Sequence, residues 1–184
     1  MPDFSEKKVY IFGASGSGTT TLGASVAERT GLVHLDSDDH YWAKGAPPLS
    51  HKNEPAERVA SMSRAIGPAG WVLSGACHGW AAEIVEQADL IVFVTLQTDA
   101  RIKRLIARER SRFGHRIDAG GDMHHIHVGF LDWARGYDLP EFSGRNLSAH
   151  EEWLAQQTKP IRRLDGQQPI KTSVDLIAAT LMAL

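Results

Sequence analysis

A glycine-rich loop near the start of the chain has residue types and spacing that favour a defined chemistry. It reads Gly13-Ala-Ser-Gly-Ser-Gly-Thr-Thr-Thr21. Glycine lets the backbone turn back and approach a ligand closely, and successive N–H groups at the start of a helix bind anions. The stretch therefore predicts a phosphate-binding site. The residues expected to hold the phosphates are Gly13, Ser15, Gly16, Ser17, Gly18, Thr19, Thr20 and Thr21.

The flanks of this loop have the order that a nucleotide-binding P-loop requires. Apolar residues 9–12 predict a buried strand, and residues 19 to about 29 predict a helix. In the pattern G-x-x-x-x-G-K-[ST], Gly13 and Gly18 take the fixed glycine positions and Thr20 takes the hydroxyl position, which binds Mg²⁺. Thr19 stands where the pattern has lysine. A Gly/Ser-rich turn without ligand is the alternative interpretation, and the matching flanks favour a phosphate site.

Size and composition fit one soluble α/β domain. The chain has 184 residues, 42% of them apolar, and a net charge of −2, which argues against nucleic-acid binding through bulk charge. The single cysteine, Cys77, fits a reducing compartment. No apolar run approaches the roughly 18 residues of a membrane span, and the start lacks an apolar signal segment. We therefore expect a cytoplasmic protein without nucleic-acid or membrane partners.

Strands and helices alternate along the chain, a pattern typical of a parallel sheet covered on both faces. A long polar loop is expected at 40–52. The predicted strands are 9–12, 32–35, 71–74, 90–96 and 161–164, and the predicted helices are 19–29, 54–66, 81–88, 98–113, 124–135, 148–157 and 172–184.

Carboxylates follow the second predicted strand directly. Asp36, Asp38 and Asp39 stand where ligands bind in open α/β sheets, at the carboxyl ends of the strands. Such side chains hold Mg²⁺ or accept a proton from an attacking hydroxyl. The alternative is a helix-capping turn, which is common after a strand.

The predicted helix 98–113 carries a row of arginines. Arg101, Arg104, Arg108 and Arg112 are three, four and four residues apart, which places them on one side, away from an expected core stripe of Ile102, Leu105 and Ile106. Because a guanidinium matches phosphate oxygens and stays charged, this row suits a lid that closes over a phosphoryl group. A solvated, ion-paired helix face is the alternative.

Histidines and aromatics near strand ends leave other interpretations open. The cluster from His115 to His127, with Asp118 and Asp122, allows a metal-binding protein, although it lacks a zinc spacing. Residues 40–42, His78 and Trp80 suit stacking on a flat or sugar-like acceptor, and core packing explains the tryptophans equally well. Cys77 is interpreted as a small buried residue and not a nucleophile.

Four segments together resemble the adenylate-kinase-like P-loop kinases, which include nucleoside monophosphate, shikimate and gluconate kinases. The resemblance implies a three-layer α/β sandwich with a five-stranded parallel sheet in the order 2-3-1-4-5 and helices on both faces. It further implies one domain over 1–184, with an acceptor-binding insert at about 37–70 and a helical lid at about 108–145. The matching segments are Gly13–Thr21, Asp36-Ser-Asp38, Arg104-Leu-Ile-Ala-Arg108 and Leu164-Asp-Gly166.

The resemblance also implies roles for single residues. Arg104 would stack on adenine, Gly166 would touch the base through its backbone, and Arg108 would clamp phosphates. Asp36 and Asp38 would serve Mg²⁺ and the acceptor. The Gly-Thr-Thr-Thr sequence also resembles the loop of some archaeal-type cytidylate kinases, so loss of the lysine need not abolish transfer. We hypothesise that Arg108, or else Arg112 or Arg116, supplies the missing positive charge.

The expected function is therefore phosphoryl transfer from ATP, with Mg²⁺, to a nucleotide or a small hydroxylated metabolite. Thr20 and Asp36 are expected to hold the metal, and Asp36, Asp38, Arg108 and Arg112 to act in catalysis. A nucleotide-binding protein with little or no turnover is the alternative, because Thr19 replaces the lysine. The residue types do not choose between a phosphate-bearing base and a polyol as acceptor.

Overall fold

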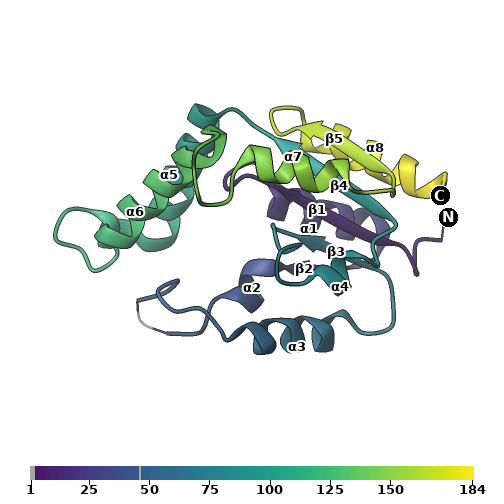
Figure 1. The fold of residues 1–184 in the computed structure, drawn as a ribbon, viewed down its shortest axis with the longest axis horizontal. Helices are drawn as coiled ribbons and strands as arrows, with labels where there is room; N and C mark the ends of the chain where they lie inside the picture. The colour runs from purple at the N-terminus through teal and green to yellow at the C-terminus, as the bar shows by residue number, and fades with distance from the viewer. Residues whose placement is uncertain (1–2, 46) are drawn as a thin grey trace.

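The protein, described here by a computed structural model over residues 3–45 and 47–184, is built around one parallel sheet. The five strands follow the order β2-β3-β1-β4-β5, which confirms the order implied by the resemblance. Figure 1 shows helices on both sides of this sheet. The strands are β1 (Lys8–Gly13), β2 (Val33–Asp36), β3 (Trp71–Ser74), β4 (Leu90–Thr95) and β5 (Ile161–Asp165).

The helices form two layers and a projecting pair. In Figure 1, α5 and α6 extend side by side from the body of the molecule. None of the described helices is long and apolar enough to cross a membrane. The helices are α1 (Thr19–Thr30), α2 (Ser37–Tyr41), α3 (Pro55–Ile66), α4 (Ala82–Val85), α5 (Thr98–Phe113), α6 (His124–Arg135), α7 (Leu147–Ala155) and α8 (Ile170–Met182), with 3₁₀ turns η1 (Gly114–Ile117) and η2 (Gly136–Asp138).

The central strand β1 faces two cores because side chains alternate along a strand. Val9 and Ile11 pack with residues of α1 and α8 in one apolar cluster. Tyr10 and Phe12 pack into a second cluster with residues of α3, α4 and α7. All four are fully buried. Burial on both faces is typical of a parallel sheet, and it holds the end of β1 rigidly where the glycine-rich loop begins.

The projecting helices α5 and α6 share a small core of their own. Ile102 and Leu105 of α5 pack against Leu131 and Ala134 of α6. Ile106, which the periodicity predicted to be part of the core stripe, is 40% exposed instead. The buried residues of α5 are Arg101, Ile102, Leu105, Glu109 and Phe113. The buried face therefore includes Arg101 and not Ile106.

A short helix, α2, lies where the sequence predicted only a turn. The Asp36 side chain accepts a hydrogen bond from the backbone N–H of Asp38 and so caps the helix. The remaining part of the predicted loop is tied by an isolated antiparallel bridge between Trp42 and Lys52. The capping interpretation of this carboxylate cluster is therefore correct for Asp36, and its second oxygen remains available for a ligand.

Candidate active site at the carboxyl edge of the sheet

The glycine-rich loop follows β1 directly and fits tightly against β4 and α5. A Cβ atom on Gly13 would lie 2.2 Å from the carbonyl oxygen of Val94. Gly16 has φ +85°, and a Cβ there would lie 2.8 Å from the carbonyl oxygen of Arg101. Gly18, with φ +103°, leads into α1. Only glycine combines this close approach with positive φ values, so the spacing read from the sequence has a steric basis.

Two arginines of α5 hold the loop by its carbonyl groups. Arg101 Nη1 donates to the Ser15 carbonyl and Arg104 Nη1 to the Ser17 carbonyl, each at 3.4 Å. In a trans peptide, the C=O of one residue points opposite to the N–H of the next. The N–H groups of Gly16 and Gly18 therefore point away from these arginines.

The amide groups of the loop form a cradle that suits an anion. Among the described residues, no acceptor takes the N–H of Ser15, Gly16 or Gly18. The Oγ of Ser17 is likewise buried without a partner in this part of the chain. Unpaired donors at the N-terminus of α1 fit the phosphates of a nucleotide. The donor set therefore matches the ATP expected from the sequence.

The predicted metal residues lie on two different elements. Thr20 is exposed at the first turn of α1, and Asp36 ends β2. No group of three or more His, Cys, Asp or Glu residues suited to a metal occurs within the described ranges. Mg²⁺ commonly keeps several waters and takes only one or two protein ligands beside phosphate oxygens. A hydroxyl and one carboxylate fit that chemistry.

Arg104 brings three segments together at the far side of the loop. Its Nη2 donates to the Gly166 carbonyl at 2.9 Å, while Nη1 reaches Ser17. The Gly166 N–H donates to the Thr95 carbonyl at 2.8 Å, and a Cβ on Gly166 would lie 2.6 Å from the Ser17 carbonyl oxygen. Arg104, Gly166 and the loop, three of the predicted donor-binding parts, are thus in direct contact.

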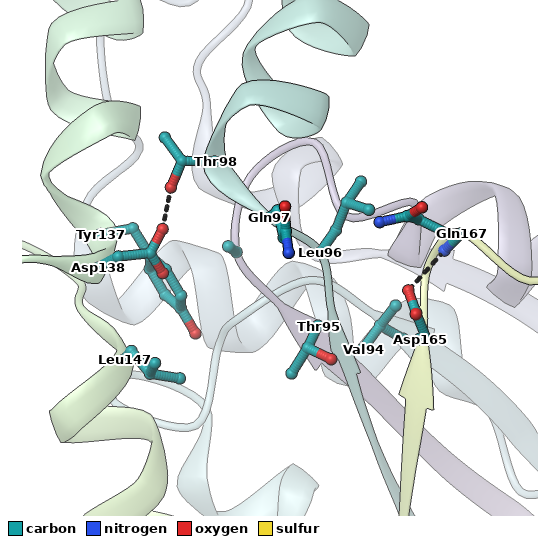
Figure 2. Close-up of a pocket in the computed structure, with 11 residues that line it drawn as sticks. Val94, Thr95, Leu96, Gln97, Thr98, Tyr137, Asp138, Leu147, Asp165 and Gln167 are labelled. Atoms are coloured by element: carbon teal, nitrogen blue, oxygen red, sulfur yellow. Dashed lines mark hydrogen bonds between the residues drawn. The ribbon is translucent and has the colours of Figure 1, made fainter.

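A cavity of about 370 Å³ adjoins this place, between the ends of β4 and β5 and the start of α7. Figure 2 shows Asp165 and Gln167 on one side, with Thr98 and Asp138 hydrogen-bonded on the other. Gln97 and Thr95 lie between them. The cavity places amide and carboxylate groups next to the Gly166 turn.

A second group of charges lies beyond the ends of β2 and β3. Burial and the neighbouring Asp36 raise the pKa of Asp38, while the positive charges of Arg145 and Arg108 act in the opposite direction. Asp38 is exposed to solvent, with much of the protein around it at longer range. Neither arginine forms an ion pair with the residues that the structure describes. The charges of two guanidiniums therefore act on this acidic group, and neither has a carboxylate partner among the described residues.

Arg145 is the residue of this site that the sequence reasoning missed. It precedes α7, is partly buried, and donates from Nη2 to the Ala76 carbonyl at 3.4 Å. Its guanidinium also lies over the Trp133 ring, 5.5 Å from the centroid. In the sequence, only its position could have pointed to Arg145: it stands at the end of the expected lid, just before the predicted helix 148–157.

The structure corrects the expected arginine row. Arg101 is fully buried and does not share an exposed face with Arg104 and Arg108. Its guanidinium donates to Asp138 at 2.8 Å, to the Leu96 carbonyl at 3.0 Å and to the Ala134 carbonyl at 3.1 Å. A guanidinium can be buried only where its N–H groups find such partners.

The other lid arginines have neighbours of their own. Arg116 pairs with Asp122 through two hydrogen bonds of 2.9 and 2.6 Å. Arg110 pairs with Asp118. The Arg112 guanidinium lies 5.1 Å from the centroid of the Phe113 ring. Of the three candidates for the missing positive charge, Arg108 is the one whose charge acts on Asp38, and its guanidinium lies 6.0 Å from the centroid of the Phe130 ring.

The histidine cluster and Cys77 have ordinary structural contacts. His124 Nδ1 lies 3.0 Å from the Ile117 carbonyl oxygen, His115 pairs with Asp118, and His127 contacts Glu109. As noted above, no metal-ligand group occurs among the described residues, so the metal-binding alternative gains no support there. Burial raises the pKa of the Cys77 thiol to about 12, which agrees with a thiol that is not a nucleophile.

Comparisons with solved structures place this fold among known ones. A gluconokinase from Sinorhizobium meliloti 1021 aligns with a TM-score of 0.51 and 17% identity, over 95% of this chain and 91% of that chain. A shikimate kinase from Bacteroides thetaiotaomicron aligns with a TM-score of 0.55 and 13% identity, over 95% and 98% of the two chains. The protein therefore has the fold of the adenylate-kinase-like P-loop kinases.

Sequence comparison then gives the family. The uncharacterized protein YqaC of Bacillus subtilis (strain 168) is 34% identical over 173 residues, which cover 94% of this chain and 96% of YqaC. The chain belongs to the same family as YqaC. A cytidylate kinase of Methanocorpusculum labreanum is 28% identical over 165 residues, 78% of this chain and 90% of that protein. No protein-family model matches the sequence.

Proposed function

We propose that this protein transfers a phosphoryl group from ATP, with Mg²⁺, to a nucleotide or a small hydroxylated metabolite. The observation that carries the proposal is the cradle of unpaired amides at Ser15, Gly16 and Gly18, held open by Arg101 and Arg104. The names of the similar proteins, cytidylate kinase, gluconokinase and shikimate kinase, support both acceptor classes.

The donor side would bind and orient ATP. The loop amides would take phosphate oxygens, and Arg104, which contacts Gly166, would stack on the base. Thr20 and Asp36 would hold Mg²⁺, which when bound neutralises charge on the outer phosphates. Catalysis of this kind depends on positioning and on charge stabilisation more than on covalent chemistry.

The acceptor side would orient the attacking hydroxyl. Asp38 is suited to accept its proton, because burial and Asp36 raise the pKa of this carboxyl toward the working pH. Arg108 and Arg145 would supply the positive charge that Thr19 does not. The charges of both act on Asp38, and both lack a carboxylate partner among the described residues.

The test is a coupled assay for ADP release, run with ATP and Mg²⁺ over nucleoside monophosphates, nucleosides and sugar acids. ADP release that depends on one class of acceptor supports the proposal. If isothermal titration calorimetry detects ATP binding but no ADP release depends on an acceptor, the alternative is favoured, a nucleotide-binding protein with little turnover. If ATP and Mg²⁺ do not bind, both readings of the loop are wrong.

A pair of variants in α1 tests whether ADP release depends on the Thr20 hydroxyl. Thr20→Ala removes an exposed hydroxyl, so we expect a normal unfolding temperature and a strong loss of Mg²⁺-dependent ADP release. Ser25→Ala removes a hydroxyl of the same helix further from the loop and serves as the matched control. Equal activity of the two variants would contradict the metal role of Thr20.

A further inference from the structure

The loop after β3 carries a histidine whose hydrogen bonds the phosphoryl-transfer scheme does not use. His78 lies between the carboxylate turn after β2 and the phosphate loop after β1, because β3 is hydrogen-bonded to both strands. Its ring nitrogen Nδ1 lies 3.1 Å from the hydroxyl oxygen of Tyr10. Tyr10 is fully buried in the middle of β1.

The hydrogen bonds of Tyr10 decide which nitrogen of His78 carries the proton. The phenol oxygen accepts the backbone N–H of Cys77 at 3.0 Å and that of His78 at 3.3 Å. A phenol has one O–H to donate and two acceptor sites. Since both acceptor sites are taken, the O–H donates to Nδ1 of His78. The neutral ring must then carry its own hydrogen on Nε2.

Aromatic packing fixes the direction of this ring. His78 stacks on Trp153 of α7 with centroids 4.4 Å apart and an angle of 24° between the planes. Phe12 and His150 pack against His78 in T-shaped arrangements, with ring centroids 5.3 and 5.4 Å from that of His78. A ring held on one face and at its edges cannot change rotamer without disturbing the core.

The Nε2 atom of His78 is free for a ligand. It has no hydrogen-bond partner among residues 3–45 and 47–184, and it is not one of the buried unpartnered atoms, in contrast to Nε2 of His150. Burial and the positive charge of Arg145 lower the pKa of His78 to about 4. The ring is therefore neutral at pH 7, and its Nε2–H is a donor that has no protein acceptor.

The surroundings indicate what this donor meets. Arg145 donates to the carbonyl of Ala76, two residues before His78, and its charge reaches Asp38. Arg108 of the lid acts on the same carboxyl. Two guanidiniums without protein carboxylate partners in the described part of the chain favour an anionic group between them. An acceptor anion bound by Arg145 would have its oxygens near the loop that carries His78, because Arg145 is hydrogen-bonded to the Ala76 carbonyl of that loop.

We propose that Tyr10 holds His78 in the form protonated at Nε2 alone, and that His78 donates a hydrogen bond from this nitrogen to an anionic oxygen of the acceptor, beside Arg145. The oxygen belongs to a phosphate or a carboxylate. His78 is thus a specificity-determining residue for the acceptor, and Tyr10 is a positioning residue. This inference rests on the proposed function, because the acceptor is the molecule which that function requires.

The first experiment reads the proton directly and needs no acceptor. In protein labelled with ¹⁵N-histidine, long-range ¹H–¹⁵N spectra at pH 7 distinguish a protonated from an unprotonated ring nitrogen, and His78→Gln assigns the signals. We expect His78 protonated at Nε2 and unprotonated at Nδ1. A proton on Nδ1 would overturn the proposal.

Two matched tyrosine variants identify the cause of the tautomer. Tyr10→Phe should shift the Nδ1 resonance of His78, because that nitrogen loses its donor. Tyr137→Phe removes another buried phenol, one that pairs with Nδ1 of His150 at 2.8 Å, and should leave the His78 signals in place. An unchanged Nδ1 resonance in Tyr10→Phe would show that the phenol does not hold the ring.

The second experiment tests the contact with the acceptor. CMP and gluconate are titrated into the labelled protein, CMP as a phosphate and gluconate as a carboxylate, and the Nε2–H resonance of His78 should move with one of them. His78→Leu should lower the affinity for that ligand roughly 10- to 100-fold, the range of a hydrogen bond to a charged group. His78→Gln should recover part of the lost affinity. The affinity for ATP should not change.

The outcomes separate this inference from the proposed function. If neither ligand moves the Nε2–H resonance, or if His78→Leu binds like the wild type, the hydrogen bond to the acceptor is wrong. Absence of acceptor-dependent ADP release would instead count against the kinase proposal, while the spectra would still report the tautomer.

Discussion

The two halves of the candidate site are built in different ways. The donor half is a short continuous loop whose backbone amides form the binding surface, and its carbonyl groups are tied to Arg101 and Arg104. The acceptor half consists of side chains from separate elements: Asp38 of α2, His78 after β3, Arg108 of α5 and Arg145 before α7. The donor half has its shape fixed by contacts within the protein, whereas the two arginines of the acceptor half have no ion-pair partner among residues 3–45 and 47–184.

This difference indicates where a substrate contributes most to the structure of the site. Oriented amides in a rigid loop cost no reorganisation when a phosphate binds. Guanidiniums on a projecting helix and a loop need an anion to bring them together, and such closure commonly excludes water from the reacting groups. Apart from the proposed metal ligands Thr20 and Asp36, the comparison predicts that single changes in the acceptor half affect turnover most and that changes in the donor half affect ATP affinity.

The largest effect is expected for Arg108→Ala. Its positive charge acts on Asp38, and it is the arginine that we propose to replace the lysine absent at Thr19. Arginines that stabilise a transferring phosphoryl group are worth about 10³-fold or more in rate. We expect kcat to fall by about that factor in the ADP-release assay, while ATP still binds.

Arg112→Ala is the matched comparison for this variant, one helical turn further along α5. The Arg112 guanidinium lies against its neighbour Phe113. If Arg112→Ala lost as much activity as Arg108→Ala, the missing charge would come from the lid as a whole. If neither variant lost activity, lid arginines would not replace the lysine, and Arg145 would be the next to test.

A smaller effect, on stability, is expected from the buried histidines under the acceptor half. Burial lowers the pKa of His150 to about 3, against 6.5 in an unfolded chain. Between these values the unfolded state binds the proton and the folded state does not, so the free energy of unfolding falls as the pH is lowered below 6.5. At pH 5 the loss from this residue is about 2 kcal/mol, from about 1.4 kcal/mol per pH unit.

Urea unfolding at pH 7 and pH 5 measures this term. The variant His150→Gln should lose less stability than the wild type over the same interval, whatever its stability at pH 7. Equal losses in the two proteins would mean that His150 is protonated in the folded state as well. Water would then have more access to this side chain than its packing indicates.

The sequence predicted the donor half because its signals are local. Residues Val9 to Thr21 contain the strand, the glycine spacing and the helix start within a single stretch, and the alternation of elements gave the five strands close to their observed bounds. The helix α2 was missed because one side chain, Asp36, decides between a turn and a cap.

The contacts of the arginines in both halves were harder to predict because they join distant parts of the chain. Arg101 and Arg104 look alike in spacing and charge, yet Arg101 is buried because Ala134 and Asp138, 33 and 37 residues away, accept its N–H groups. Arg145 meets Ala76 across 69 residues. Neither contact leaves a period or a motif in the sequence.

The smallest effect is expected in the donor half, for Arg104→Ala. This change removes the hydrogen bonds to the Gly166 and Ser17 carbonyls and the flat surface proposed for the base. The loop keeps its steric constraints at Gly13 and Gly16 and its tie to Arg101, so the amide cradle should persist.

We therefore expect the KM for ATP to rise about 10-fold, which is about 1.4 kcal/mol and on the scale of a guanidinium stacked on an aromatic ring, with kcat and the KM for the acceptor within about twofold of the wild type. Steady-state ADP release with each substrate varied in turn measures both. A fall in kcat as large as that of Arg108→Ala would mean that Arg104 acts on the transferring phosphoryl group. The separation between a donor half that sets affinity and an acceptor half that sets turnover would then be lost, because α5 would serve both through adjacent turns.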